Sequence, residues 1–202
     1  MQVWNFVPIE KKHKRSEFDC GNRELNQYLS RYARQNHLKG INKAFVATKK
    51  ATPLKIDGYY TISSSTIAFV SFPESERQGI PNYPIPCALI GRLAVDVSCQ
   101  GQGLGGELLV DALIRIVKVS QEIGIYAVRV DAIDEKADEC GLGGFPAART
   151  RRSSFSTTGG RMPTQQLVQD AKQFYLKYEF IPFTDSSLSL FLPLKTIEKE
   201  FC

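Results

Sequence analysis

The sequence predicts a mixed α/β fold in which strands and helices share one core. An apolar strand over residues 87–95 runs into a glycine-rich turn and then into an amphipathic helix over residues 103–123. A second run, Tyr126–Ala132, is apolar on both faces, which is typical of a central strand covered by helices. The 202 residues, 43% of them hydrophobic, are enough for one well-packed core, so one domain is expected.

Local patterns give the elements before the turn. Residues 3–7 are expected to form a short strand, and Asn22 is expected to cap a helix over residues 23–38. Residues 43–48 and 56–69 are rich in β-branched and aromatic side chains, as strands are. The apolar face of the first helix is predicted to contain Leu25, Leu29, Tyr32 and Ala33.

Proline and periodicity place the remaining elements. Four prolines at 73, 81, 84 and 86 predict a loop over residues 73–86. Residues 171–180 have the pattern of a helix that stops before a proline, and residues 188–194 that of a final strand.

The turn between the central strand and its helix is suited to holding a phosphate. Glycines at 101, 103, 105 and 106 leave backbone N–H groups free to face a ligand, at the positive end of a helix. A Walker loop is excluded, because no Lys-Ser or Lys-Thr follows these glycines. The glycines also match the dinucleotide fingerprint formally, but Asp131 lies too late in the chain for it. A tight turn that binds nothing remains the alternative.

Composition sets broad limits. A net charge of +5 modestly favours a polyanionic partner and equally suits an ordinary basic protein. The cysteines at 20, 87, 99, 140 and 202 contain no Cys-x-x-Cys pair, and His13 and His37 are isolated, so neither a disulfide framework nor a metal site is predicted. Without a signal peptide pattern or a long apolar run, we expect a cytoplasmic protein that is not in a membrane.

Several motifs resemble the GNAT N-acetyltransferases. Gln100-x-x-Gly103-x-Gly105 is similar to the pyrophosphate loop that binds acetyl coenzyme A in that family. Phe174-Tyr175-x-x-Tyr178-Glu179-Phe180 is similar to the end of a family helix, with Glu179 where glycine is usual. Four segments further resemble the toxin enzymes of bacterial toxin–antitoxin pairs: Phe18–Leu29, Gly58–Ser63, Gly91–Asp96 and Phe191–Ile197.

This resemblance implies a fold and a donor site. The fold is the GNAT fold, a twisted and mostly antiparallel mixed sheet flanked by helices, with a splayed central strand pair. A bulge at Leu93–Val95 separates that pair, and the exposed backbone groups bind the pantetheine arm of acetyl-CoA, the acetyl donor. The residues implied to bind acetyl-CoA are Leu93, Ala94, Val95, Gln100, Gly101, Gln102, Gly103, Leu104, Gly105 and Gly106.

The resemblance also implies an acceptor. The toxins transfer acetyl to the α-amine of an aminoacyl-tRNA, which stops translation. Tyr175 matches the family's catalytic tyrosine, whose phenol protonates the departing thiolate, although a core aromatic is the alternative interpretation. No histidine or glutamate in these motifs stands out as a base, so deprotonation through water is expected. The basic residues expected to contact RNA phosphates are Arg31, Arg34, Lys39, Lys43, Arg77 and Arg92.

Partners follow from the same resemblance, which implies a homodimer held by a ribbon-helix-helix antitoxin. Two other functions remain open on the sequence: an acetyltransferase for a small-molecule or protein amine, and a catalytically impaired variant that only binds its antitoxin or the coenzyme.

One segment departs from the family pattern. Residues 138–163 interrupt a stretch that is continuous in the family, so we expect an insertion within the single domain, 1–202. Its glycine, serine and arginine content suits a disordered surface segment or an RNA-binding loop. After it, Thr164 is expected to cap a new helix that carries Tyr175.

Overall fold

A computed structural model of the chain describes residues 4–131, 171–186 and 188–201. The predicted insertion at 138–163 and the predicted cap at Thr164 lie outside these residues. In the described residues the strands are β1 (Trp4–Pro8), β2 (Lys43–Lys49), β3 (Gly58–Ile67), β4 (Ile85–Val95), β5 (Ala127–Asp131), β6 (Ile181–Pro182) and β7 (Ser189–Pro193). The helices are α1 (Arg23–Tyr28), α2 (Arg34–Lys39), α3 (Leu104–Ser120) and α5 (Leu194–Phe201), and residues 171–176 are also helical.

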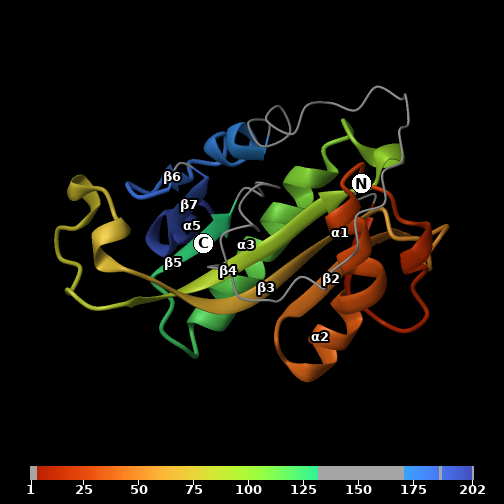
Figure 1. The fold of residues 1–202 in the computed structure, drawn as a ribbon, viewed down its shortest axis with the longest axis horizontal. Coiled ribbons are helices and arrows are strands. Elements are labelled where there is room, and N and C mark those ends of the chain that lie inside the picture. Colours follow the sequence, from red (N-terminus) through yellow and green to blue (C-terminus); the bar gives the residue numbers. More distant parts are fainter. Residues whose placement is uncertain (1–3, 132–170, 187, 202) are drawn as a thin grey trace, which may run out of the picture.

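The strands form one twisted sheet in the order β1-β2-β3-β4-β5-β7-β6 (Figure 1). β4 and β5 are parallel and are joined by the crossover helix α3, whereas the other neighbouring strands are antiparallel. This confirms the predicted mixed, mostly antiparallel sheet.

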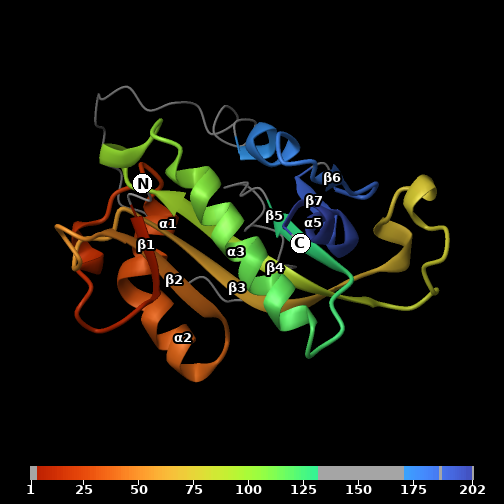
Figure 2. The same ribbon diagram turned by 180° about the vertical axis from the view of Figure 1, so that it is seen from behind.

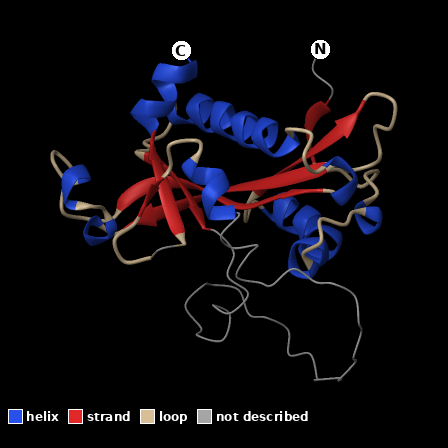
Figure 3. Ribbon diagram, turned by 90° about the horizontal axis from the view of Figure 1, so that it is seen from above, coloured by secondary structure: helices blue, strands red, loops and turns tan. Residues whose placement is uncertain are grey.

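Helices cover both faces of this sheet (Figure 3). Seen from behind, α3 crosses the strands, and its apolar side packs with α5 in the larger buried cluster, which includes Leu108, Leu113 and Ile197 (Figure 2). A second cluster under α1, with Leu25, Leu29 and Ile56, covers the opposite face. The core is therefore split between two layers on either side of the strands.

The first helix begins as predicted but contains a wider turn. The side chain of Asn22 accepts hydrogen bonds from the backbone N–H groups of Glu24 and Leu25, which confirms the cap. Residues 29–33 form a π-helical turn between α1 and α2. Tyr32 lies inside this wider turn, which shifts its side chain from the position that α-helical spacing gives it, so it is 42% exposed and the prediction that it belongs to the buried face was wrong. Tyr28 occupies that face instead, at 8% exposure.

Three further boundaries differ from the sequence-based expectation. Pro86 lies inside β4 rather than in the loop; near a strand start its missing N–H costs little, and its carbonyl accepts a 2.9 Å bond from Tyr126 N. α3 ends at Ser120, before residue 123. α5 was not predicted: Leu194 and Ile197 pack against the core at helical spacing directly after β7.

Candidate active site

The strand that was predicted to bind the donor separates from its parallel neighbour. β4 pairs with β5 only over Cys87–Ile90, and among the described residues Gly91–Val95 have no partner on that side. The register on the β3 side shifts between Thr61 and Ile62, which leaves Gly91 as the extra, bulged residue. The bulge therefore lies at Gly91, two residues before the Leu93–Val95 segment where the resemblance placed it. Alternate backbone groups of that segment therefore lack a strand partner within the described part of the chain.

The turn after β4 has the backbone shape that its glycines allow. Gly101 and Gly103 have φ angles of +73° and +86°, in the left-handed region that other residues rarely adopt. A Cβ at either position would meet no atom within 4 Å, so backbone shape, not space, requires glycine there. Within the described chain, the N–H groups of residues 101–103 donate to no backbone carbonyl. These donors lie at the positive end of the 17-residue helix α3, which suits an anionic ligand.

The next two glycines serve close packing. A Cβ on Gly105 would lie 3.5 Å from the Phe174 ring and 3.8 Å from Val95 Cγ2. A Cβ on Gly106 would overlap the hydroxyl of Tyr178. The first turn of α3 therefore contacts both the end of β4 and the segment that carries Tyr175, so the three predicted parts of the site come together here.

Two glutamine side chains hold the turn in place. Gln100 Nε2 donates to the carbonyls of Val95 at 3.0 Å and Cys20 at 3.2 Å. Gln102 Nε2 donates to the carbonyl of Ser98 at 2.9 Å. Both were predicted to bind the donor. Their amide groups close the loop onto its own backbone, while the loop's own N–H groups stay available.

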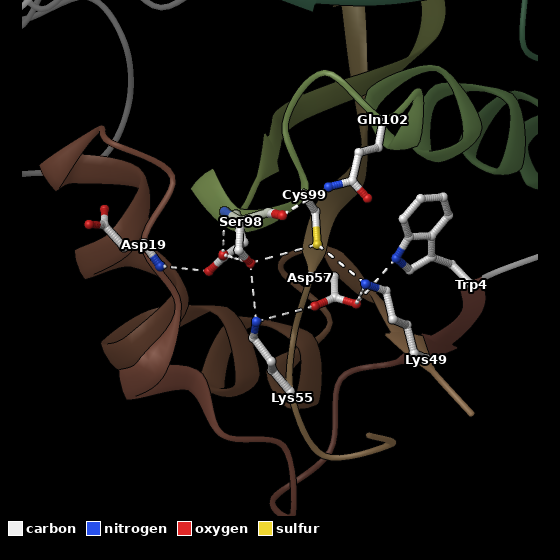
Figure 4. A network of polar contacts seen from close by, with 9 residues as sticks. Trp4, Asp19, Lys49, Lys55, Asp57, Ser98, Cys99 and Gln102 are labelled. Carbon is white, nitrogen blue, oxygen red and sulfur yellow. Dashed lines mark hydrogen bonds and ion pairs between the residues drawn. The ribbon is translucent and has the colours of Figure 1, made fainter. Parts of the chain in front are cut away.

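A buried carboxylate, Asp57, supports the turn from below (Figure 4). Its side chain accepts a 3.2 Å bond from Trp4 Nε1 and lies 3.8 Å from Lys49 Nζ and 3.7 Å from Lys55 Nζ. Lys55 Nζ also donates to Ser98 Oγ at 3.1 Å, and the Asp57 carbonyl accepts a 2.8 Å bond from Asp96 N. The network thus joins strands β1, β2 and β3 to the start of the turn. The sequence analysis missed it.

Asp96 belongs to the same network, since its backbone N–H donates to the Asp57 carbonyl. Its carboxylate accepts bonds from Ser98 Oγ at 2.5 Å, Ser98 N at 3.0 Å and Asp19 N at 3.1 Å. Burial acts to raise the pKa of Asp96, but these hydrogen bonds outweigh it and hold the pKa below its ordinary value. Asp96 is therefore ionised at neutral pH and connects Asp19 in the N-terminal segment to Ser98, just before the glycine turn.

Tyr175 lies in the larger buried cluster at 7% exposure, with ring centroids 5.1 Å from Phe174 and 5.4 Å from Phe180. Burial, and then the negative charge of Asp131, raise its pKa well above the ordinary value. Asp131 accepts 3.0 Å bonds from Arg129 and a 2.7 Å bond from Ser189 Oγ. The phenol therefore keeps its proton at physiological pH, as a proton donor must.

The helix that carries Tyr175 ends in a left-handed residue. Glu179 has a φ of +63°, which costs a non-glycine residue roughly 1–2 kcal/mol. The chain then turns so that Phe180 N donates to the Tyr175 carbonyl at 3.3 Å. This explains the motif, in which glycine is usual at that position.

The predicted RNA-contacting residues do not form one group. Arg31, Lys39 and Lys43 are exposed on the α1–α2 segment and the start of β2, with Arg34 half-buried beside them. Arg92 stacks on the Tyr28 ring at 3.8 Å. The β3–β4 loop, to which Arg77 belongs, lies at the end of the sheet opposite α1 (Figure 1). Within that loop Arg77 donates two 2.8 Å bonds, to the carbonyls of Val70 and Phe72.

A hollow of about 390 Å³ lies beside α3, next to the turn. Its lining includes Phe6, Gly103, Gly106, Ile114 and Tyr178. No helix within the described ranges is long and apolar enough to cross a membrane.

Comparison with known proteins places this architecture. No family model matches the chain. A curated relative, the "tRNA-acetylating toxin" of Mycobacterium tuberculosis, is 35% identical over 122 residues, which are 60% of this chain and 71% of that protein. A solved structure of AtaT complexed with acetyl-methionyl-tRNAfMet has a TM-score of 0.75 and 26% identity, covering 98% of this chain and 99% of that chain.

A tyrosine-to-phenylalanine mutant of AtaT, solved with the C-terminus of the antitoxin AtaR and acetyl-CoA, has a TM-score of 0.68 and 25% identity, covering 99% of each chain. The similarity to AtaT therefore extends over nearly the whole chain. With this fold and the identity to the mycobacterial protein, the chain belongs to the family of tRNA-acetylating toxins with the GNAT fold and is an acetyl-CoA-dependent acetyltransferase.

Proposed function

We propose that this protein transfers the acetyl group of acetyl-CoA to the α-amine of an aminoacyl-tRNA and so stops translation. The observation that carries the proposal is the meeting of three parts at Gly105: the separated end of β4, the turn with free N–H groups, and the helix of Tyr175. The complexes of AtaT with acetyl-methionyl-tRNAfMet and with acetyl-CoA support both substrates.

The donor site follows from backbone groups. The amides of residues 101–103, at the start of α3, bind the pyrophosphate of acetyl-CoA. The unpaired backbone of Leu93–Val95 binds the pantetheine arm as a neighbouring strand would. The hollow lined by Gly103 and Tyr178 leaves room beside the turn for the nucleotide end of the donor.

Transfer requires one bond to form and one to break. The neutral α-amine attacks the thioester carbonyl, whose oxyanion is stabilised by N–H groups of the separated β4 segment. When the intermediate collapses, the C–S bond breaks, the amine loses a proton to water, and Tyr175 donates its proton to the departing thiolate. Tyr175 is protonated at neutral pH, as a proton donor must be, and its raised pKa makes it a weaker acid than a free tyrosine, so the donation depends on its position beside the departing thiolate.

Basic residues contribute to binding of the nucleic acid. The segment from α1 to the start of β2 contacts tRNA phosphates through Arg31, Arg34, Lys39 and Lys43. Arg92 lies beneath α1, against Tyr28, and adds to this surface. Arg77 lies at the other end of the sheet and contacts a different part of the tRNA.

Assembly and location are part of the same proposal. The protein is a cytoplasmic homodimer, and a ribbon-helix-helix antitoxin neutralises it, in line with the complex of AtaT with AtaR. The chain is one domain over residues 1–202, with an insertion at 138–163.

One experiment tests the acceptor. The purified protein is incubated with radiolabelled acetyl-CoA and either charged tRNA, uncharged tRNA, or free amino acids and polyamines. Label on charged tRNA alone is expected. Label on the small amines with none on charged tRNA would establish the small-molecule alternative, and retention of acetyl-CoA without any transfer would establish the impaired one.

A further inference from the structure

The ammonium group of Lys55 links a buried carboxylate to the segment that leads into the glycine turn (Figure 4). Lys55 lies in the connection between β2 and β3. Its Nζ donates to Ser98 Oγ at 3.1 Å and lies 3.7 Å from Asp57 Oδ1. Asp57 is almost fully buried, whereas the side chain of Lys55 is 41% exposed. A carboxylate fixed inside the protein therefore holds a cation whose other contact is Ser98.

Ser98 passes this contact on to the turn. Its hydroxyl also donates to Asp96 Oδ1 at 2.5 Å, so it is held between a cation and a carboxylate. Its carbonyl accepts a 2.9 Å bond from Gln102 Nε2. Gln102 is one of the three turn residues whose backbone N–H groups have no carbonyl partner in the described part of the chain. The position of Ser98 therefore bears directly on the shape of the turn.

Such a contact matters because the turn is rich in glycine. Gly101 and Gly103, on either side of Gln102, have more backbone freedom than any other residue type, so ordering them costs more entropy. Each contact that orders the turn before a ligand arrives lowers the cost of binding that ligand. Fixing Ser98 therefore favours a turn whose N–H groups are already in place for an anion.

A second lysine beside Asp57 lacks this contact. Lys49 Nζ lies 3.8 Å from Asp57 Oδ2 and 3.8 Å from Cys99 Sγ, and a thiol sulfur is only a weak acceptor. It also lies 5.7 Å from the centre of the Trp4 ring. Of the two lysines, only Lys55 hydrogen-bonds an oxygen atom of the segment before the turn.

We infer that Lys55 is a positioning residue of the donor site: held by Asp57, it fixes Ser98, and Ser98 orders the turn that binds the pyrophosphate of acetyl-CoA. This inference rests on the proposed donor site and adds a residue that keeps it in shape. Lys55 acts through Ser98 and not by touching the donor. Its loss therefore lowers the affinity for acetyl-CoA and leaves the chemical step unchanged. A half-exposed ion pair contributes little to stability, so the effect on affinity can be measured in a folded protein.

The test is calorimetric titration of the purified variants with acetyl-CoA. Lys55→Met keeps an apolar stem but removes the ammonium group, and it is expected to raise the Kd about fivefold, as for one hydrogen bond. Ser98→Ala also removes the bond to Asp96 and is expected to raise the Kd about tenfold. In the double variant the Kd is expected to stay within about twofold of Ser98→Ala, because the contact of Lys55 is already absent there.

Two further measurements separate positioning from other effects. Lys50→Met removes an exposed positive charge from the same β2–β3 connection, so it controls for net charge and is expected to leave the Kd unchanged. The second measurement is transfer from S-acetyl-pantetheine, which has the thioester and the arm but no pyrophosphate. Lys55→Met is expected to leave kcat/KM for this short donor unchanged, while the KM for acetyl-CoA rises about fivefold at an unchanged kcat.

Each of four results would overturn the inference. Losses of Lys55→Met and Ser98→Ala that multiply in the double variant would show that Lys55 attracts the donor by its charge. An equal loss in Lys50→Met would make it an effect of net charge. An equal loss of kcat/KM with S-acetyl-pantetheine would make it an effect on the fold. An unchanged Kd in Lys55→Met would remove its role.

Gly103→Ala distinguishes failure of the inference from failure of the proposed donor site. If Gly103→Ala weakens acetyl-CoA binding and Lys55→Met does not, the donor site stands without Lys55. If neither variant changes the Kd, the turn does not bind the donor, and the inference fails with it.

Discussion

Gly106 on the first turn of α3 lies directly beneath the hydroxyl of Tyr178, so that the smallest side chain at this position would overlap it. Replacing a glycine inside a helix by alanine ordinarily stabilises the helix by up to about 1 kcal/mol. In Gly106→Ala the half-buried Tyr178 side chain has to swing away from α3, so the helix gain is offset and a net loss of about 1 kcal/mol of unfolding free energy is expected. Urea denaturation measures it. Gly124→Ala, where a Cβ meets nothing within 4 Å, is the control and should be nearly neutral.

Gly103→Ala is expected to weaken acetyl-CoA binding at least tenfold. The φ of +86° is strained for alanine, so the backbone relaxes and the free N–H groups turn away from the pyrophosphate. Gly40 has a similar φ of +73° at the end of α2 and equally open space. Gly40→Ala therefore carries the same backbone strain without the ligand. Calorimetry that finds equal losses of affinity in both variants would contradict a role for this turn.

Tyr175→Phe is expected to lower kcat on the order of a hundredfold, while the Kd for both substrates and the unfolding free energy change little. The lost hydroxyl acts only when the thiolate departs, and the ring packing with Phe174 and Phe180 stays. Single-turnover kinetics with charged tRNA measures the change. Tyr126→Phe, which removes the hydroxyl of a tyrosine just before β5, is the matched control. A kcat within a few-fold of the parent would make Tyr175 only a core aromatic.

Asp96 makes the stability of the protein sensitive to acid. Its folded-state pKa is lower than that of an unfolded aspartate, so its contribution is complete above about pH 4 and is lost as the pH falls through the folded-state pKa. Asp96→Asn is expected to be about 1–2 kcal/mol less stable at pH 7. The difference from the parent should shrink toward pH 2 in urea titrations. A constant difference across that range would show that the ionised carboxylate is not the stabilising species.

Replacing Arg31 and Lys39 together by glutamine is expected to weaken tRNA binding and to flatten its dependence on salt, since each phosphate contact contributes about one unit to that slope. Both side chains are exposed, so stability should change little. Filter binding between low and moderate salt gives the slope. Replacing the exposed Lys11 and Lys12 together by glutamine removes the same two positive charges and controls for net charge.

Local rules predicted local structure. Asn22 as a cap and the strand–turn–helix around residues 101–106 follow from spacing within a few residues, whereas β6 and α5 were not predicted. The role of Asp57 could not be predicted, because Trp4 and Lys55 contact its carboxylate only once β1, β2 and β3 have assembled into the sheet. The π turn that exposes Tyr32 likewise could not be predicted, because it has no recognisable spacing of apolar residues in the sequence.

The glycines of the turn show the limit of a prediction made from residue spacing alone. All four were assigned to the ligand, yet Gly105 and Gly106 are needed by Phe174 and Tyr178, which lie in another part of the chain. Only the left-handed φ angles of Gly101 and Gly103 separate the two groups, and a backbone angle is not written in the sequence.

The short parallel pairing of β4 and β5 also bears on how the protein holds together. Among the described residues, four pairs join the β1–β4 half of the sheet to the β5–β7–β6 half, and the rest of β4, Gly91–Val95, has no strand partner on that side. On the proposed site, a donor bound along this unpaired part of β4 connects the two halves of the sheet as further strand pairing would. Its binding energy then counts toward cohesion of the whole sheet, about 2.7 kcal/mol at a hundredfold excess over its Kd. On the proposed donor site, acetyl-CoA would therefore raise the unfolding free energy of the protein, and thermal denaturation with and without acetyl-CoA measures that gain.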